Sequence, residues 1–252
     1  MSFEPNCKDV QMKIKILYED SDILAIDKPS GILVHPDQKS EDKTILDLFV
    51  KKYPKVKIVH RLDRETSGVM LLAKNAKTHE FLKNQFKNRE VKKTYNTIVS
   101  GWVKNDHATI NKPIGRSPKD FRRHLAGRGA RGELREAITE YTVLRRFKRS
   151  DLESLKRSDL DEPFTYLEVR PKTGRTHQIR VHMKFINHPI ACDSLYNPNG
   201  SCPKGLNRLA LHAKSIEFNL PAQTGDLKGK IIKIESPFPK EFQKIAKIRS
   251  LC

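Results

Sequence analysis

Apolar and polar positions alternate along the chain in short runs that predict both strands and helices. Two β-rich runs within 13–27 flank an acidic turn, a pattern typical of a hairpin. Ile45, Leu48 and Phe49 have the i, i+3, i+4 spacing of one helix face, which predicts a helix over 44–53. The remaining predicted elements are helices over 75–86 and 177–186 and strands over 69–73, 93–100, 137–147, 164–170, 209–218 and 230–235. Because they do not alternate as βαβ units, we expect an α+β domain with a mostly antiparallel sheet.

One stretch, 113–135, fits neither period and differs in composition. Its cationic and imidazole side chains are Arg116, Lys119, Arg122, Arg123, His124, Arg128, Arg131 and Arg135, and they are interspersed with Gly127, Gly129 and Gly132. This composition predicts a mobile basic loop. A solvated surface segment and a nucleic-acid-binding arm are equally good interpretations of it. Further along, a second charged insertion, RSDLESLKRSDLDEP, separates two predicted strands.

The overall charge is far more positive than solubility requires. Lys and Arg total 49 against 30 Asp and Glu, which leaves a net charge of +19 with neutral histidines. A polyanionic partner is the natural inference, and RNA, DNA and an anionic membrane surface all fit it. The membrane is the weakest of these, because the chain has no run of roughly 18 apolar residues and no dominant basic amphipathic helix.

The N-terminus and the cysteines indicate a cytoplasmic protein. The opening MSFEPNCKDVQ lacks the apolar core of a signal peptide, and its Glu4 and Asp9 are unlike a transit peptide. The four cysteines are too few and too scattered for a disulfide framework, and none forms a C-x-x-C pair. We expect them to be reduced, as is usual in the cytosol. They are Cys7, Cys192, Cys202 and Cys252.

The segment HRLDRETSG at 60–68 is the first candidate for chemistry. It lies between apolar runs, where loops often display functional groups. Asp63 has an arginine close on either side in sequence, and a nearby guanidinium favours the ionised carboxylate needed by a nucleophile or an electrostatic stabiliser. A surface charge cluster of small energetic value is the alternative, and the segment alone does not decide between them.

Two further segments carry polar groups with more than one interpretation. In PKTGRTHQIRVHM at 171–183, a helix would leave Arg180 available for a carboxylate or a phosphate. The histidines at 177, 182 and 188 lack the i, i+4 spacing of a helical zinc site, so we expect no metal there. Tyr95 begins a strand among lysines. It suits base stacking and proton transfer, or an ordinary half-buried strand position.

The absence of several motifs narrows the reaction class. The chain has no G-x-x-x-x-G-K-[ST] phosphate loop, no G-x-G-x-x-G after a strand and no G-x-S-x-G elbow. We therefore expect an enzyme that needs no cofactor.

Several motifs in one order resemble the RluA family of pseudouridine synthases. The segment HRLDRETSGVMLLAKN at 60–75 is similar to the family signature. The others are ILAIDKPSGILVHP near the start, KKTYNTIVSG at 92–101, PKTGRTHQIRVHM at 171–183 with HPI after it, and NRLALHAKSIEF at 207–218. The resemblance implies a pseudouridine synthase fold, with a mixed, largely antiparallel sheet in two halves, flanking helices and a catalytic cleft. It also implies cofactor-free isomerisation of uridine in RNA, by cleavage of the N1–C1′ bond and rejoining through C5.

The resemblance assigns expected roles to individual residues. Asp63 corresponds to the catalytic aspartate, Tyr95 to the tyrosine that packs on the target base, and Arg180 to the basic residue that pairs with the aspartate. Arg61 corresponds to an arginine associated with base flipping, and Leu211, or else Leu209, to the apolar strand that completes the pocket. We also expect RNA or substrate contacts from His60, Arg175, His177, Arg116, Arg122, Arg123, Arg128 and Arg131.

The chain departs from the family pattern in two places. Ala191-Cys192-Asp193 stands where relatives often have glycine before the aspartate, and the resemblance begins too near Met1 for an N-terminal S4 domain. We therefore expect a tail over 1–12 and one catalytic domain over 13–252. Substrate selection would rest on that domain and its basic loop, with ribosomal or transfer RNA as the partner. No obligatory protein partner is expected, and a monomer is compatible with this reading.

Two functions from other classes compete with this prediction. An RNA-binding or RNA-chaperone protein without catalysis would share the charge, although the presence of Asp63, Tyr95 and Arg180 argues against it. A base-excising glycosylase would share base flipping and a carboxylate but would release free uracil.

Overall fold

The computed structural model of the chain describes residues 14–36, 42–148, 162–203, 205–221 and 229–246. The expected tail over 1–12 and most of the charged insertion at 149–163 lie outside the described residues, as do Cys7 and Cys252. The domain limits therefore stay a prediction.

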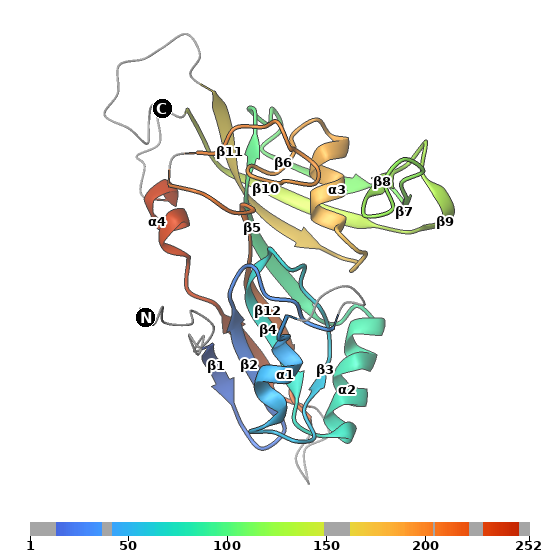
Figure 1. Cartoon of the computed structure of the whole chain (residues 1–252), viewed down its shortest axis with the longest axis vertical. Helices are drawn as coiled ribbons and strands as arrows, with labels where there is room; N and C mark the ends of the chain where they lie inside the picture. The colour runs from blue at the N-terminus through green and yellow to red at the C-terminus, as the bar shows by residue number, and fades with distance from the viewer. Residues whose placement is uncertain (1–13, 37–41, 149–161, 204, 222–228, 247–252) are drawn as a thin grey trace, which may run out of the picture.

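One long sheet runs through both halves of the molecule (Figure 1). Its order is β1-β2-β4-β12-β5-β11-β10-β6, with β13 added to β12 and β3 to β4. Its strands are β1 Lys15–Glu19, β2 Ile23–Lys28, β3 Lys57–Ile58, β4 Ser67–Ala73, β5 Lys92–Ser100, β6 His107–Asn111, β10 Ile138–Lys148, β11 Pro163–Pro171, β12 Leu211–Asn219 and β13 Ile231–Glu235. Among the described strands, only β4 and β12 pair in parallel. The mixed, largely antiparallel sheet matches the expected fold class.

Helices flank the sheet, and side chains close to their first residues fix where two of them begin. They are α1 Ile45–Val50, α2 Ala76–Lys87, α3 Gln178–Phe185 and α4 Lys240–Ala246. Thr44 and Asp47 form a reciprocal capping box at the start of α1, and the Asn75 side chain accepts the Thr78 amide at the start of α2. The sequence prediction missed α4, β3 and β6.

The apolar side chains form two main cores that meet at β5. The first contains the buried residues of β2 and β4, and the second is built around β5, β11 and α3. Tyr95 packs against both cores, because its strand lies between β12 of one half and β11 of the other. A residue at this position faces the junction between the halves.

The expected mobile basic loop is instead an ordered three-stranded sheet, which we call the basic arm (residues 113–135). Its strands are β7 Ile114–Arg116, β8 His124–Ala126 and β9 Arg131–Arg135, in the order β8-β7-β9. A small core that includes Ile114, Ala126 and Val181 of α3 packs the arm onto the rest of the chain. The strands are too short, and too interrupted by arginines, for their alternation to stand out in the sequence.

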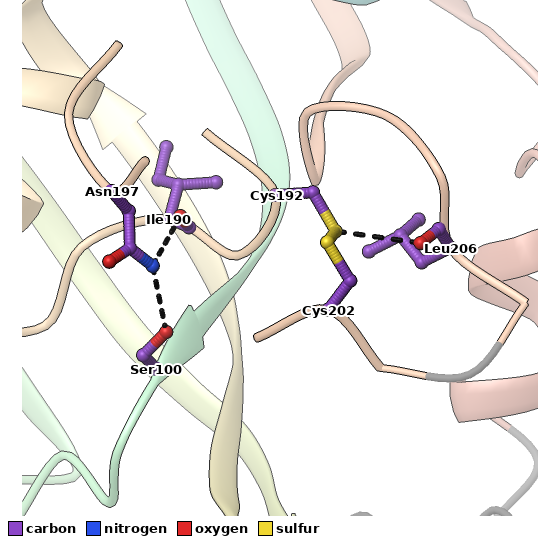
Figure 2. The surroundings of a disulfide bond; sticks show 6 residues. All are labelled: Ser100, Ile190, Cys192, Asn197, Cys202 and Leu206. Atoms are coloured by element: carbon purple, nitrogen blue, oxygen red, sulfur yellow. Dashed lines mark hydrogen bonds between the residues drawn. A yellow bond between two sulfur atoms is a disulfide. The ribbon is translucent and has the colours of Figure 1, made fainter. Parts of the chain in front are cut away.

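The expectation that all four cysteines are reduced is wrong for one pair. Cys192 and Cys202 form a disulfide, and their Cα atoms are 5.2 Å apart (Figure 2). Nearby, the Asn197 side-chain amide donates to the Ser100 hydroxyl at 3.2 Å. The pairing escaped prediction because it depends on how the chain after Ile190 turns back on itself. The disulfide closes a loop that contains Asp193 and Tyr196.

Gly68 allows β4 to approach β12 closely. Its φ is +115°, and a Cβ there would collide with the backbone of Ala213, including its carbonyl oxygen. We expect Gly68→Ala to lower the free energy of unfolding by about 3 kcal/mol or more, because a backbone clash is added to the strain of positive φ. Urea denaturation followed by circular dichroism measures this loss.

Gly129→Ala is the matched control for this prediction. Gly129 also has a positive φ, +88°, but a Cβ there would meet nothing within 4 Å. The free energy of unfolding of Gly129→Ala should fall by only about 1–2 kcal/mol, the cost of the left-handed conformation alone. Equal losses in the two variants would show that the approach of β4 to β12 is not the constraint.

Candidate active site

The loop that carries Asp63 is held from beneath by a buried lysine. Lys28 is fully buried, and its ammonium donates to the carbonyl oxygens of Pro29, Arg64 and Thr66 at 2.9–3.0 Å. Burial lowers the pKa of Lys28 to about 7, although the negative charge of Asp63 acts in the opposite direction. Three bonds to carbonyl oxygens fix the backbone on both sides of Glu65, and so constrain the loop that presents Asp63.

The Arg180 guanidinium faces three carboxylates. Its Nε and Nη2 donate to the two carboxylate oxygens of Asp193 at 2.8 and 2.7 Å. Its Nη1 lies 3.6 Å from Oδ2 of Asp63, and Nη2 lies 3.8 Å from Oε2 of Glu65. The expected pairing with Asp63 is therefore a longer electrostatic contact, while Asp193 makes the bidentate bonds that orient the guanidinium.

Asp193 is itself fully enclosed and well bonded. Its side chain is buried, and Oδ1 also accepts the backbone amides of Leu195 and Tyr196 at 3.0 and 2.9 Å. Burial acts to lower the pKa of Arg180, but the bonds and charge of Asp193, together with Asp63, outweigh it, so that the pKa is raised. Arg180 thus keeps its positive charge in a buried setting.

Tyr95 lines the same space and is close enough to Asp63 to be influenced by its charge. Burial, and then the negative charge of Asp63, raise the pKa of the Tyr95 hydroxyl. The phenol is therefore protonated near neutral pH, where it can donate a hydrogen bond or stack through its ring.

These side chains converge on one cavity of about 530 Å³. That volume is within the range of small-molecule sites. The sequence-predicted residues that line it are His60, Arg61, Asp63, Tyr95, Arg175, His177, Arg180 and Leu211. Leu209, the alternative to Leu211, is buried in the second core and is not among the lining residues.

Two lining residues make structural contacts of their own. The Nε2 of His60 accepts the Leu71 amide at 3.0 Å, and its ring stacks on Phe86. Burial lowers the pKa of His60 to about 3, so this ring is neutral. The Nε of Arg175 donates to the Glu136 carbonyl at 2.9 Å, which ties the start of α3 to the chain before β10.

The predicted RNA-binding arginines of the basic arm lie outside the cavity. None of the described lining residues belongs to 113–135. Arg116, Arg128 and Arg131 are exposed, whereas Arg122 and Arg123 form ion pairs with Asp120. The arm therefore presents positive charge to solvent, separate from the residues that meet at Asp63.

Sequence reasoning missed four residues that shape the site. Lys28, Asp193 and Tyr196 act through backbone or side-chain bonds, and Lys93, which lines the cavity, donates to the Thr173 carbonyl at 3.1 Å. The signals were weak. Lys28 and Lys93 lie within two of the quoted motifs, ILAIDKPSGILVHP and KKTYNTIVSG, but no role was assigned to either, and Asp193 was noticed only as part of a departure from the family pattern.

No helix in the described part of the chain is both long and apolar enough to cross a membrane. Within the same residues, no group of three or more His, Cys, Asp or Glu side chains is arranged to hold a metal ion.

The sequence matches known proteins over most of its length. A model of the RNA pseudouridylate synthase family matches residues 22–185. The uncharacterized RNA pseudouridine synthase YlyB of Bacillus subtilis is 34% identical over 96% of this chain and 76% of that protein. An uncharacterized RNA pseudouridine synthase of Aquifex aeolicus is 38% identical over 81% of this chain and 63% of that protein. The ribosomal large subunit pseudouridine synthase D of Xanthomonas campestris is 34% identical over 92% of this chain and 68% of that protein. The chain thus spans 63–76% of the length of these relatives.

Solved structures share the fold. Human RNA pseudouridylate synthase domain containing 1 superimposes with a TM-score of 0.72 at 24% identity, over 90% of this chain and 84% of that one. Human RNA pseudouridylate synthase domain containing 4 superimposes with a TM-score of 0.66 at 26% identity, over 91% of this chain and 90% of that one. The family match over 22–185 and the sequence relatives confirm the resemblance of the motifs: the chain belongs to the RNA pseudouridylate synthase family, whose members are isomerases that act on RNA.

Proposed function

We propose that this protein converts specific uridines of structured ribosomal RNA to pseudouridine, with Asp63 as the essential carboxylate. The observation that carries the proposal is the convergence of Asp63, Tyr95 and Arg180 on one cavity. The reaction breaks the N1–C1′ bond, turns the uracil and forms a C5–C1′ bond. C5 loses a proton and N1 gains one, so the composition of the nucleotide is unchanged and no redox agent is needed.

The geometry supports a distinct role for each of the three residues. The Asp63 carboxylate acts at the sugar–base bond, as nucleophile or as electrostatic stabiliser. Arg180, held by Asp193, keeps a positive charge beside that carboxylate. Tyr95 packs on the uracil, and its protonated hydroxyl is suited to the proton transfers that the exchange at C5 and N1 requires.

Base flipping gives the remaining cavity residues their proposed roles. A stacked uridine cannot present its glycosidic bond, so the enzyme must extrude it at a cost of a few kcal/mol. Arg61 is exposed at the cavity and is suited to fill the space that the uridine leaves. Leu211 supplies an apolar wall for the extruded base, and His60, Arg175 and His177 complete the site around it.

The charge favours RNA as the partner, and a named relative favours ribosomal RNA among the RNAs. The net charge of +19 matches a polyanion, and the exposed arginines of the basic arm, Arg116, Arg128 and Arg131, are suited to backbone phosphates. The named relative from Xanthomonas is a ribosomal large subunit enzyme. Transfer RNA is the alternative outcome of a substrate test.

We propose that the protein acts in the cytoplasm, without a cofactor or an obligatory protein partner and as a monomer. Its family acts on RNA, which agrees with that compartment. The Cys192–Cys202 disulfide argues the other way, because such bonds are uncommon in the cytosol.

We expect Asp63→Asn to lower the rate of pseudouridine formation by about a thousandfold or more, because the variant keeps the shape of the side chain but removes its charge. Its affinity for RNA should stay within about threefold, because most of that affinity comes from phosphate contacts. The assay uses ribosomal RNA transcribed with uridine tritiated at C5. When C5 forms its bond to C1′, the tritium at C5 is released into water and can be counted.

Glu65→Gln is the control, because it removes another carboxylate near Arg180 without touching the cavity lining, and it should retain most of the activity. Turnover by Asp63→Asn at the wild-type rate would reject the role of Asp63. Release of free uracil by the wild-type protein would indicate a glycosylase, and binding with no product at all would indicate an RNA-binding protein.

Neutralising Arg128 and Arg131 in the basic arm should weaken RNA binding and flatten its dependence on salt. Each lost contact to a duplex phosphate lowers the slope of log affinity against log salt concentration by about 0.9, so the double change to glutamine should lower it by about 1–2. Filter binding between low and moderate salt measures the slope.

Lys51→Gln with Lys55→Gln removes the same charge from exposed positions in the segment that follows α1 and serves as the control. If both pairs change the slope equally, the effect comes from net charge and not from the basic arm.

A further inference from the structure

Tyr196 lies between the basic arm and the active-site cavity and touches both. Its side chain is buried, and its hydroxyl oxygen accepts the backbone amide of His124 in β8 at 2.9 Å. The same oxygen lies 3.0 Å from Nδ1 of His177, which lines the cavity. The guanidinium of Arg180 sits 5.2 Å from the centre of the Tyr196 ring. One phenol therefore joins a strand of the arm to a residue of the site.

These contacts determine which nitrogen of His177 carries its proton. A tyrosine hydroxyl has one proton to donate, and the His124 amide already takes up one of its acceptor positions. If Nδ1 of His177 were protonated, the buried Tyr196 proton would have no acceptor among the hydrogen bonds of the described residues. Burial raises the pKa of Tyr196 to about 12, so the hydroxyl keeps its proton and donates it to Nδ1.

His177 is then a neutral ring with its proton on Nε2. Burial lowers the pKa of His177, although Asp63 acts in the opposite direction. A neutral imidazole that accepts at one nitrogen donates at the other, which leaves the Nε2–H group as its donor.

The backbone gives independent support for a functional position. His177 has a φ of 55°, in the left-handed region that is uncommon for residues other than glycine, although histidine occupies it more often than most. It is the N-cap of α3, yet its side chain makes no capping hydrogen bond and turns instead to Tyr196. Strained backbone that is maintained by its surroundings is often found at functional sites.

We propose that His177 donates its Nε2–H to an acceptor oxygen of the nucleotide in the cavity, and that Tyr196 is a positioning residue that fixes the tautomer required for this bond. The inference rests on the proposed function of the cavity. Because the His124 amide anchors the Tyr196 hydroxyl, the seating of the basic arm and the donor state of His177 depend on the same oxygen atom.

Two substitutions of His177 separate the two ring nitrogens. Glutamine places an amide N–H close to the position of Nε2, whereas asparagine places its amide near Nδ1. We expect His177→Gln to retain kcat/KM within about threefold and His177→Asn to lose about tenfold, the effect of one hydrogen bond. The assay is tritium release from the transcribed ribosomal RNA.

The left-handed backbone makes this comparison stringent. Asparagine tolerates a positive φ better than glutamine, so strain alone would favour His177→Asn in both stability and activity. Thermal unfolding of both variants measures that strain. Equal losses of activity, or a larger loss in His177→Gln, would overturn the proposal.

A double substitution tests Tyr196 as a positioning residue. Tyr196→Phe keeps the ring over Arg180 but removes the hydroxyl, and it should lower kcat/KM about fivefold in the wild-type background. In His177→Gln, which has no tautomers, the same change should have less than a twofold effect. A purely structural bond to the His124 amide predicts the same loss in both backgrounds, and that result would reject the positioning role.

The ¹⁵N chemical shifts of His177 provide a readout that does not depend on activity. They should show a protonated Nε2 in the wild-type protein and a mixture of tautomers in Tyr196→Phe. A protonated Nδ1 in the wild type would contradict the inference. If the wild-type protein forms no pseudouridine, the proposed function fails, but the tautomer is still decided by these spectra.

Discussion

The bidentate ion pair between Arg180 and Asp193 is the interaction on which the arrangement of the site depends. A buried ion pair is stable only when the geometry is good and the remaining polar atoms are bonded, because both charges lose their hydration. Here Asp193 also accepts the amides of Leu195 and Tyr196, and the guanidinium is fixed on one edge. Its free edge is thereby directed at Asp63. Without Asp193, the buried guanidinium would lose its bidentate partner and, of its carboxylate contacts, keep only the longer ones to Asp63 and Glu65.

The site also depends on where the two cores meet. Tyr95 comes from a strand that joins the halves of the sheet and packs against both cores, while Asp63 belongs to a loop of the first half. Arg180 comes from α3 in the second half. The three side chains of the proposed site therefore come from a loop, a strand and a helix that belong to both halves of the molecule.

The sequence predicted those parts of the fold and site that leave a local or repeated signal. The hairpin, the long strands and the main helices follow from periodicity, and the residues lining the cavity follow from motifs around Asp63 and Arg180. The basic arm was misjudged as mobile because its three strands are only three to five residues long and the turns between them are rich in glycine and charge. Asp193, Tyr196 and the disulfide could not be found, since each depends on the path of the loop after Ile190, which no period encodes.

Lys28 holds the loop of Asp63 through bonds to the main chain and not through bonds to side chains. Its ammonium donates hydrogen bonds to the carbonyl oxygens of residues 29, 64 and 66. These bonds do not involve the side chains of those three residues. The side chain of Arg64 holds the loop from its outer face, through Nε to the Gly31 carbonyl oxygen at 3.0 Å and Nη2 to the Asp42 carboxylate at 2.8 Å. Any substitution around Asp63 that keeps the main chain in place therefore leaves the three lysine bonds intact.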